Sequence, residues 1–378
     1  MSHGMTKLTQ SSLTGGGYIT PEFLTLQEFP ERARANLPDT TWDYLAGAAE
    51  TETTYLRNRL ALDCLAFRPR VLQDVTTSNV TGRFLGRDLR IPVLLAPIGS
   101  LESFAEGGGV AAAKGADAFG VDHMLSSVCQ PDMETVAASV DQPTLFQLYV
   151  RGDDAFVDDA AVRAKDAGYR AFCITVDTVV YSRRERDIVR RYLPAGRRRG
   201  GSGQKFQSGF DWAKVARFKE KHDMPLILKG IATAEDAAKA VEYGVECIYV
   251  SNHGGRQLDF GRGAIDVLPE VVEAVGGKAE IAVDGGFCRG TDIVKAMILG
   301  ADVVGIGRMQ GYALAAGGID GLVRMLELLE RECESALGLL GVRSFAELDS
   351  SYLTTAPPVY SPSEFSAFPH IRFGRQHP

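Results

Sequence analysis

Short apolar stretches recur along the chain from about residue 90, and amphipathic, alanine-rich segments separate them. Continuous apolar strands that alternate with helices are typical of a parallel sheet covered on both faces. Eight strand–helix units in a chain of this length fit a closed barrel better than an open doubly wound sheet. The pattern therefore predicts an α/β fold, a (β/α)8 TIM barrel with an N-terminal helical segment and a C-terminal extension. The eight predicted strands cover residues 91–97, 123–128, 144–150, 171–177, 225–230, 247–252, 280–286 and 303–308.

The barrel does not account for the whole chain. We expect residues 1–20 to form a flexible N-terminus, residues 21–349 to form the barrel with its N-terminal helices, and residues 350–378 to form a C-terminal tail. One or two helices are expected between residues 20 and 75. After the fourth predicted strand, residues 190–209 are basic and glycine-rich. Such a segment is either a mobile surface loop or a lid over a binding site.

The composition excludes some classes of partner. A formal net charge of −7 argues against nucleic acid, although a local cluster of cations could still bind a phosphate or a carboxylate. No stretch approaches the roughly 20 apolar residues of a membrane span, so no membrane partner is expected. The six cysteines show no CxxC pair and no metal-ligand spacing. This predicts no metal site and a reducing compartment, the cytoplasm.

Small and polar residues gather at the carboxyl ends of the predicted strands, where a (β/α)8 barrel carries its active site. Residues 251–259, SNHGGRQLD, contain the clearest chemistry. His253 can exchange a proton near neutral pH, and Asp177 could orient it and stabilise its charged form. Four more side chains could hold an anionic substrate through guanidinium or hydroxyl groups: Arg184, Arg256, Tyr44 and Tyr149.

The seventh and eighth predicted strands end in the glycine-rich sequences DGGFCRGTD and GIGRMQG. In such barrels these two ends frequently bind a phosphate through backbone N–H groups and a helix N-terminus, and Arg308 adds a guanidinium. Lys229, at the end of the fifth strand, requires an anionic partner or a lowered pKa. A lysine beside a flavin ring and a Schiff-base lysine of the aldolase kind both fit this pattern.

These motifs, in this order, resemble those of the FMN-dependent 2-hydroxy-acid oxidases and dehydrogenases, the family of glycolate oxidase, lactate oxidase and mandelate dehydrogenase. The resemblance covers about residues 25 to 345 and rests on FQLYV, TVDT with SRRERD, LILKGI, SNHGGRQLD and DGGFCRGTD with GIGR. It implies an FMN enzyme that oxidises an L-2-hydroxy acid to a 2-keto acid, passes electrons to O2 or another acceptor, and forms a homo-oligomer, a tetramer.

The resemblance also implies individual roles. His253 would accept the hydroxyl proton or the α-proton, and Asp177 would hold it. Arg184 and Arg256 would bind the substrate carboxylate, and Tyr44 and Tyr149 would contact the substrate. Three groups of residues would bind FMN: the flavin ring would meet Pro97, Ile98, Gly99, Ser126, Gln147 and Thr175; its N1 edge would meet Lys229; and the ribityl phosphate would meet Ser251, Asp284, Gly285, Gly286, Arg289, Gly307 and Arg308.

Two positions differ from the usual family pattern. The family usually has an arginine where this chain has Cys288, and Arg289 is the neighbouring cation. Many members have an aromatic residue where this chain has Val128, which predicts a roomier or more apolar pocket wall. Three rival functions remain at this point: another FMN barrel such as a type 2 isopentenyl diphosphate isomerase, a barrel that binds flavin or a partner without catalysis, and an aldolase-type phosphate barrel.

Overall fold

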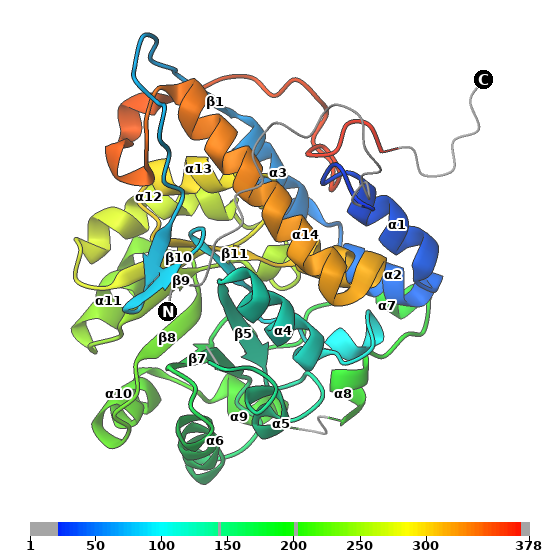
Figure 1. The fold of residues 1–378 in the computed structure, drawn as a ribbon. Helices are drawn as coiled ribbons and strands as arrows, with labels where there is room; N and C mark the ends of the chain where they lie inside the picture. The colour runs from blue at the N-terminus through cyan, green and yellow to red at the C-terminus, as the bar shows by residue number, and fades with distance from the viewer. Residues whose placement is uncertain (1–21, 143–144, 200–202, 372–378) are drawn as a thin grey trace, which may run out of the picture.

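The computed structural model describes residues 22–142, 145–199 and 203–371. Eight parallel strands close into a barrel in the order β10-β11-β4-β5-β6-β7-β8-β9, and Figure 1 shows helices surrounding it. All eight predicted strands form, which confirms the (β/α)8 prediction. Their bounds are Val93–Leu95 (β4), Asp122–Ser126 (β5), Leu145–Leu148 (β6), Ala171–Thr175 (β7), Leu226–Ile231 (β8), Cys247–Val250 (β9), Glu280–Val283 (β10) and Val303–Ile306 (β11).

Helices follow the barrel strands as the amphipathic segments predict. Several begin at a side-chain cap: Asp153 accepts a hydrogen bond from the backbone N–H of Phe156, and Thr233 accepts one from that of Asp236. The helices around the barrel are Gly109–Phe119 (α4), Met133–Ala137 (α5), Asp154–Asp166 (α6), Trp212–Lys221 (α10), Ala234–Glu242 (α11), Ala264–Val275 (α12), Gly290–Ile298 (α13) and Arg308–Leu340 (α14).

A hairpin that the sequence pattern did not predict closes the amino-terminal end of the barrel. Its strands are Gly82–Phe84 (β2) and Arg87–Leu89 (β3). Phe84 and Leu89 belong to the same buried cluster as the inward-facing Met124, Leu145 and Tyr249. With this end filled by side chains, the open end of the barrel is the one where the strands' carboxyl termini meet.

Three helices, rather than the one or two expected, precede the barrel: Glu28–Asn36 (α1), Asp39–Ala46 (α2) and Thr53–Asp63 (α3). Two short strands, Leu65–Phe67 (β1) and Leu353–Thr355 (β12), pair antiparallel, so the C-terminal segment returns to the N-terminal one. The expected flexible N-terminus, residues 1–20, lies outside the described residues. None of the helices in the described ranges is long and apolar enough to cross a membrane.

The described part of the segment between β7 and α10 folds into three short helices instead of a featureless loop. They are Glu185–Val189 (α7), Ala195–Arg199 (α8) and Gln204–Ser208 (α9). Gly196 is tied to the rim of the barrel because its backbone N–H donates to Ser100 Oγ at 2.8 Å. Residues of α8 and α9 line the pocket described below, so this segment covers the open end of the barrel, as a lid does.

Candidate active site

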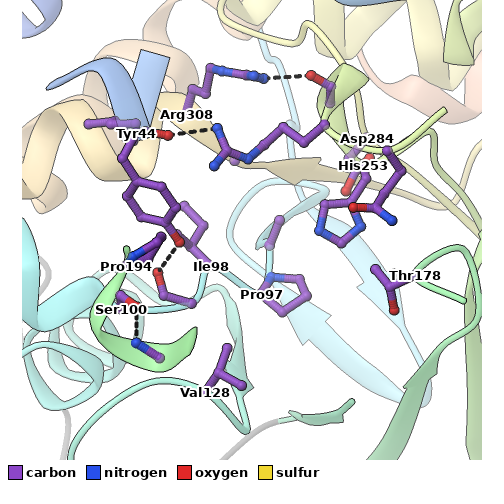
Figure 2. Close-up of a pocket in the computed structure, with 18 of the residues that line it drawn as sticks. Tyr44, Pro97, Ile98, Ser100, Val128, Thr178, Pro194, His253, Asp284 and Arg308 are labelled. Carbon is purple, nitrogen blue, oxygen red and sulfur yellow. Dashed lines mark hydrogen bonds between the residues drawn. The ribbon is translucent and has the colours of Figure 1, made fainter. Parts of the chain in front are cut away.

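A large pocket opens at the carboxyl ends of the strands and extends from the N-terminal helices to α14. Figure 2 shows Tyr44 and His253 on opposite sides of it, with Pro97 between them and Arg308 on the side away from Val128. Fourteen of the twenty predicted site residues line this pocket: Tyr44, Pro97, Ile98, Gly99, Tyr149, Arg184, Lys229, His253, Arg256, Asp284, Gly285, Gly286, Gly307 and Arg308.

His253 follows β9 in a tight turn whose backbone requires the two glycines after it. The φ angles of His253, Gly254 and Gly255 are +58°, +62° and +77°, a left-handed conformation that glycine adopts without strain. A Cβ on Gly255 would lie 2.6 Å from the backbone nitrogen of Tyr55, so only glycine fits there. The side-chain amides of Asn252 and Asn58 bond each other and fix the turn to α3.

The imidazole of His253 is held in one orientation by Asp177. Its Nδ1 lies 3.0 Å from the Asp177 carboxylate, and its Nε2 lies 3.2 Å from the hydroxyl of Tyr149. Burial lowers the pKa of His253 below its ordinary value, although Asp177 opposes this shift. The ring is therefore neutral at neutral pH, and with Nδ1–H donating to Asp177, Nε2 is the basic atom. Asp177 itself lies behind His253 and does not line the pocket.

Two guanidinium groups share the pocket with His253. Arg256 donates to the backbone carbonyls of Tyr44 and Gly47 at 2.6 and 2.7 Å, and Arg184 makes only long contacts of 3.4 Å with neutral oxygens. Neither donates to a carboxylate within the described chain. Burial lowers the pKa of Arg256 to about 10, and repulsion from Arg184 adds to the shift. An incoming carboxylate would relieve both the desolvation and the repulsion.

Lys229 lies at the end of β8 beneath the pocket, with its Nζ 2.7 Å from Ser251 Oγ and 3.1 Å from Asp284 Oδ2. Burial alone would lower the pKa of Lys229, but Asp284 and Asp177 outweigh it and the pKa lies above its ordinary value. A lysine that keeps its proton is a poor nucleophile, so the geometry disfavours the Schiff-base alternative and favours a lysine that faces a developing negative charge.

Four predicted flavin contacts, Ser126, Gln147, Thr175 and Ser251, are buried at the strand ends instead of lining the pocket. Gln147 Nε2 donates to Thr175 Oγ1 at 2.9 Å, whereas Gln147 Oε1 is buried with no hydrogen-bond partner among the described residues. Buried polar atoms are rarely left unpaired. A ring N–H stacked over the strand ends would satisfy this oxygen, so the residues present fit a flavin.

At the far end of the pocket, the two predicted phosphate loops come together as expected, but Arg289 does not join them. Gly286 and Gly307 line the pocket, and a Cβ on Gly307 would meet nothing within 4 Å, which leaves open space at the start of α14. Arg289 instead forms an ion pair of 2.6 Å with Glu332 of α14 and is absent from the pocket lining. Cys288 lines the pocket in its place.

Several lining residues were not identified from the sequence. The guanidinium groups of Arg184 and Arg197 both lie over the ring of Tyr181, at 5.0 and 3.6 Å from its centroid. Phe104 stacks on Tyr44 with centroids 5.9 Å apart. Tyrosines and phenylalanines in amphipathic segments ordinarily pack in the core, so nothing in their local sequence marks them. Within the described ranges, no group of three or more His, Cys, Asp or Glu side chains could hold a metal ion.

Comparisons with known proteins agree with this arrangement. The family model described as FMN-dependent dehydrogenase matches residues 33–355. The chain is 37% identical to L-lactate oxidase of Nostoc sp., over 87% of this chain and 98% of that protein. It is 36% identical to glycolate oxidase of Spinacia oleracea, over 88% and 96%. A solved structure of mandelate oxidase is similar with a TM-score of 0.82 at 36% identity and covers 89% of this chain and 100% of that one.

The match spans the barrel, the N-terminal helices and the paired terminal strands, and the relatives are covered almost completely. The cradle of glycines, the unpaired Gln147 oxygen and the protonated Lys229 suit the cofactor that the family name specifies. This chain therefore belongs to the FMN-dependent dehydrogenase family and is a flavoenzyme that oxidises 2-hydroxy acids to 2-keto acids.

Proposed function

We propose that the enzyme oxidises an L-2-hydroxy acid with His253 as its base and O2 as its electron acceptor, which releases hydrogen peroxide. One observation carries this assignment: the basic Nε2 of His253 and two guanidinium groups without a carboxylate partner in the described chain, those of Arg184 and Arg256, line the same pocket. A neutral base beside two cations suits a substrate with a carboxylate on the carbon next to its hydroxyl.

The chain's own residues bind and orient the substrate. Arg184 and Arg256 hold its carboxylate and thereby place the 2-hydroxyl group beside His253. His253 Nε2 takes the hydroxyl proton, and Asp177, bonded to Nδ1, stabilises the imidazolium that results. Tyr149 keeps its proton because burial raises its pKa, so its hydroxyl can donate to the substrate oxygen. Tyr44, whose hydroxyl lies 3.4 Å from the Gly99 carbonyl, bounds the opposite side.

FMN supplies the acceptor of the substrate's electron pair when it is bound. Gln147 and Lys229 would meet the polar edge of its ring, and Pro97, Ile98 and Gly99 would lie against the ring's opposite edge. Charged Lys229 would stabilise negative charge there, which raises the oxidising power of a flavin. The glycines after β10 and β11 would approach its phosphate.

We propose a substrate larger than glycolate, with an apolar side chain. Phe104, Val128 and Pro194 line the pocket on the side of Tyr44, so an apolar group would replace water there and gain about 0.8 kcal/mol per buried CH2 group. Mandelate oxidase, the similar solved structure, has such a substrate in its name.

Anaerobic addition of a panel of L-2-hydroxy acids to the purified flavoprotein tests both parts. We expect loss of the oxidised flavin absorbance with the apolar members, slower loss with glycolate, and recovery of the absorbance with peroxide formation when air is admitted. A flavin that no 2-hydroxy acid reduces would overturn the assignment of the base and the clamp. Reduction without peroxide on reoxidation would overturn O2 as the acceptor.

We further propose a homotetramer that works in the cytoplasm. All six cysteines are free, which supports a reducing compartment, although plant relatives such as GLO4 of Oryza sativa are named as peroxisomal. Light scattering coupled to size-exclusion chromatography would give four times the chain mass of 40.8 kDa for a tetramer. The mass of a single chain would contradict the proposal, and fractionation of the source cells would test the compartment.

A further inference from the structure

The cations at the Cys288 end of the pocket are mostly neutralised by carboxylates within the protein. Arg59 forms two hydrogen bonds with Asp292, at 2.8 and 2.9 Å, and an ion pair of 2.7 Å with Asp63. Arg289 is paired with Glu332. Because these guanidinium groups already have carboxylate partners, they have little positive charge left for the phosphate of FMN.

The N-terminus of α13 is also occupied. The backbone N–H groups of Cys288 and Arg289 both donate to Asp292 Oδ2, at 3.0 and 3.1 Å, and that of Gly290 donates to Glu332 at 2.8 Å. The first N–H groups of a helix ordinarily serve as an anion site. Here they are satisfied by the protein's own carboxylates, so α13 cannot hold the phosphate, and the start of α14 is the helix end that remains.

Arg308, the first residue of α14, is the guanidinium at this end that no carboxylate within the described residues neutralises. It donates to the carbonyl oxygens of Gly47 and Gly254 at 2.7 and 2.9 Å. Its guanidinium group lies 3.8 Å from the ring centroid of Tyr55, a residue of α3 that is 4% exposed and lines the pocket. Burial raises the pKa of Tyr55 to about 12, so its hydroxyl is a hydrogen-bond donor at neutral pH.

A second tyrosine, Tyr312, lies near Tyr55 and lines the same pocket. Tyr312 is 2% exposed, and its buried hydroxyl has no hydrogen-bond partner among the described residues. Burial raises the pKa of Tyr312, and nearby Tyr55 raises it further. An unpaired buried hydroxyl beside a second hydroxyl is costly unless the second one becomes an acceptor. The Tyr55 oxygen can accept from the Tyr312 hydroxyl while its own O–H is donated to a ligand.

We propose that the phosphate of FMN is held by the hydroxyl of Tyr55 together with Arg308 and the start of α14. Tyr312 donates to Tyr55 as a positioning residue, and Cys288 leaves the space that the phosphate fills. Burial raises the pKa of the Cys288 thiol to about 12, so this position adds neither positive nor negative charge. The subsite binds its anion mainly through hydroxyl and backbone donors and one guanidinium group, in place of the two arginines expected from the family. The assignment concerns cofactor binding and does not depend on the identity of the substrate.

Comparison of FMN with riboflavin isolates the phosphate contribution, since the two differ only in that group. Equilibrium dialysis of the full chain against graded concentrations of each flavin would give the ratio of their dissociation constants. We expect Tyr55→Phe, which keeps the ring on Arg308, to weaken FMN about tenfold and leave riboflavin unchanged, as for loss of a hydrogen bond to a charged group. Tyr312→Phe should weaken FMN by a smaller factor in the same direction.

Cys288→Arg is the reciprocal variant. It supplies a guanidinium group beside the expected phosphate, so FMN should bind about tenfold more tightly while riboflavin does not, and Tyr55→Phe should then cost less in this background. Cys288→Ser controls for the loss of the thiol. Tyr169→Phe controls for the loss of a buried hydroxyl, because the Tyr169 hydroxyl donates to the backbone oxygen of Met133 at 2.9 Å outside the flavin pocket. The proposal would be overturned if the ratio of the FMN and riboflavin dissociation constants did not change in Tyr55→Phe. If Tyr55→Phe did not fold, an unchanged ratio in Cys288→Arg would overturn it.

Discussion

At the His253 end of the pocket, Arg184 and Arg256 are half-buried and donate to no carboxylate in the described chain, whereas at the Cys288 end Arg59 and Arg289 are both paired with carboxylates. In the proposed function both ends bind an anion, the substrate carboxylate in one case and the FMN phosphate in the other. Half-buried guanidinium groups that donate to no carboxylate favour an incoming carboxylate at the first end. In our proposal the second end binds its anion through the N–H groups at the start of α14, a tyrosine hydroxyl and a single guanidinium group. Fewer positive charges therefore contribute to its affinity for the anion.

The difference has a functional meaning. A substrate must bind and leave in every catalytic cycle. The charge that develops on it during the reaction is stabilised best by hydrogen-bond donors that are already fixed in place. A cofactor stays bound through many cycles and gains affinity from its whole ring and ribityl chain, so its phosphate site can use weaker donors. Variants at the two ends should therefore fail in different ways, which gives a means of testing the comparison.

The largest effect is expected for His253→Asn. Asparagine tolerates the left-handed backbone of this position, so the turn and the bound FMN should be retained. Loss of the base should slow flavin reduction by substrate about a thousandfold, as measured by anaerobic stopped-flow absorbance. A reduction rate within tenfold of the wild-type value would show that another group takes the proton.

The next effect separates the two arginine environments. Arg256→Met removes one half of the carboxylate clamp, so kcat/KM should fall about a hundredfold, in line with the loss of charge-assisted hydrogen bonds. FMN content should stay normal. Arg183→Met is the matched control, because Arg183 is exposed and absent from the pocket lining. Equal losses in the two variants would point to a general effect of net charge instead of a clamp.

The eight strands and the His253 end of the pocket could be predicted because their signals are local. Apolar runs mark buried strands, and residues 251–259 contain the proposed base, the two glycines and one arginine of the proposed carboxylate clamp in a single stretch. The turn of the β2–β3 hairpin, Leu85-Gly86, has φ angles of +43° and +80°. Leucine is an unusual residue for such a turn, so the hairpin gave no recognisable signal.

The Cys288 end could not be predicted in the same way because its charge balance depends on partners far apart in the sequence. The nearest cation in sequence, Arg289, was expected to face the phosphate. Its partner Glu332 lies 43 residues later on α14, and no local pattern indicates that pairing. The role we propose for Tyr55 depends likewise on Arg308, a residue far from it in the sequence whose guanidinium group lies over the Tyr55 ring.

The pH dependence tests the charge states at the substrate end. The proposed base, His253, can accept a proton only when neutral, and its pKa is below the ordinary value of 6.5, so kcat/KM should rise with pH along a limb centred below pH 6.5 and then level off. Loss of the Arg256 proton, with a pKa of about 10, should lower kcat/KM again at alkaline pH. Each limb should change kcat/KM by up to tenfold per pH unit.

Asp177→Asn sharpens this test. Removal of the carboxylate takes away the interaction that raises the pKa of His253, so the acid limb should move to lower pH while the plateau falls. An acid limb that stays in place in this variant would mean that it reports a group other than His253.

The smallest effect should come from the wall of the substrate pocket. Val128 packs against Gly99, since a Cβ on Gly99 would lie 2.6 Å from Val128 Cγ2, and it shares the pocket lining with Phe104. In Val128→Phe the ring should occupy space otherwise available to the substrate side chain. The ratio of kcat/KM for an aromatic relative to a two-carbon hydroxy acid should then fall about tenfold, within the range for small steric changes in an apolar pocket. Val180→Phe, at a position that is 67% exposed, should leave the ratio unchanged.

Because Val128 is remote from the Cys288 end, the affinity for FMN should be the same in Val128→Phe and Val180→Phe. If Val128→Phe also lowered the affinity for FMN, the two ends of the pocket would be coupled.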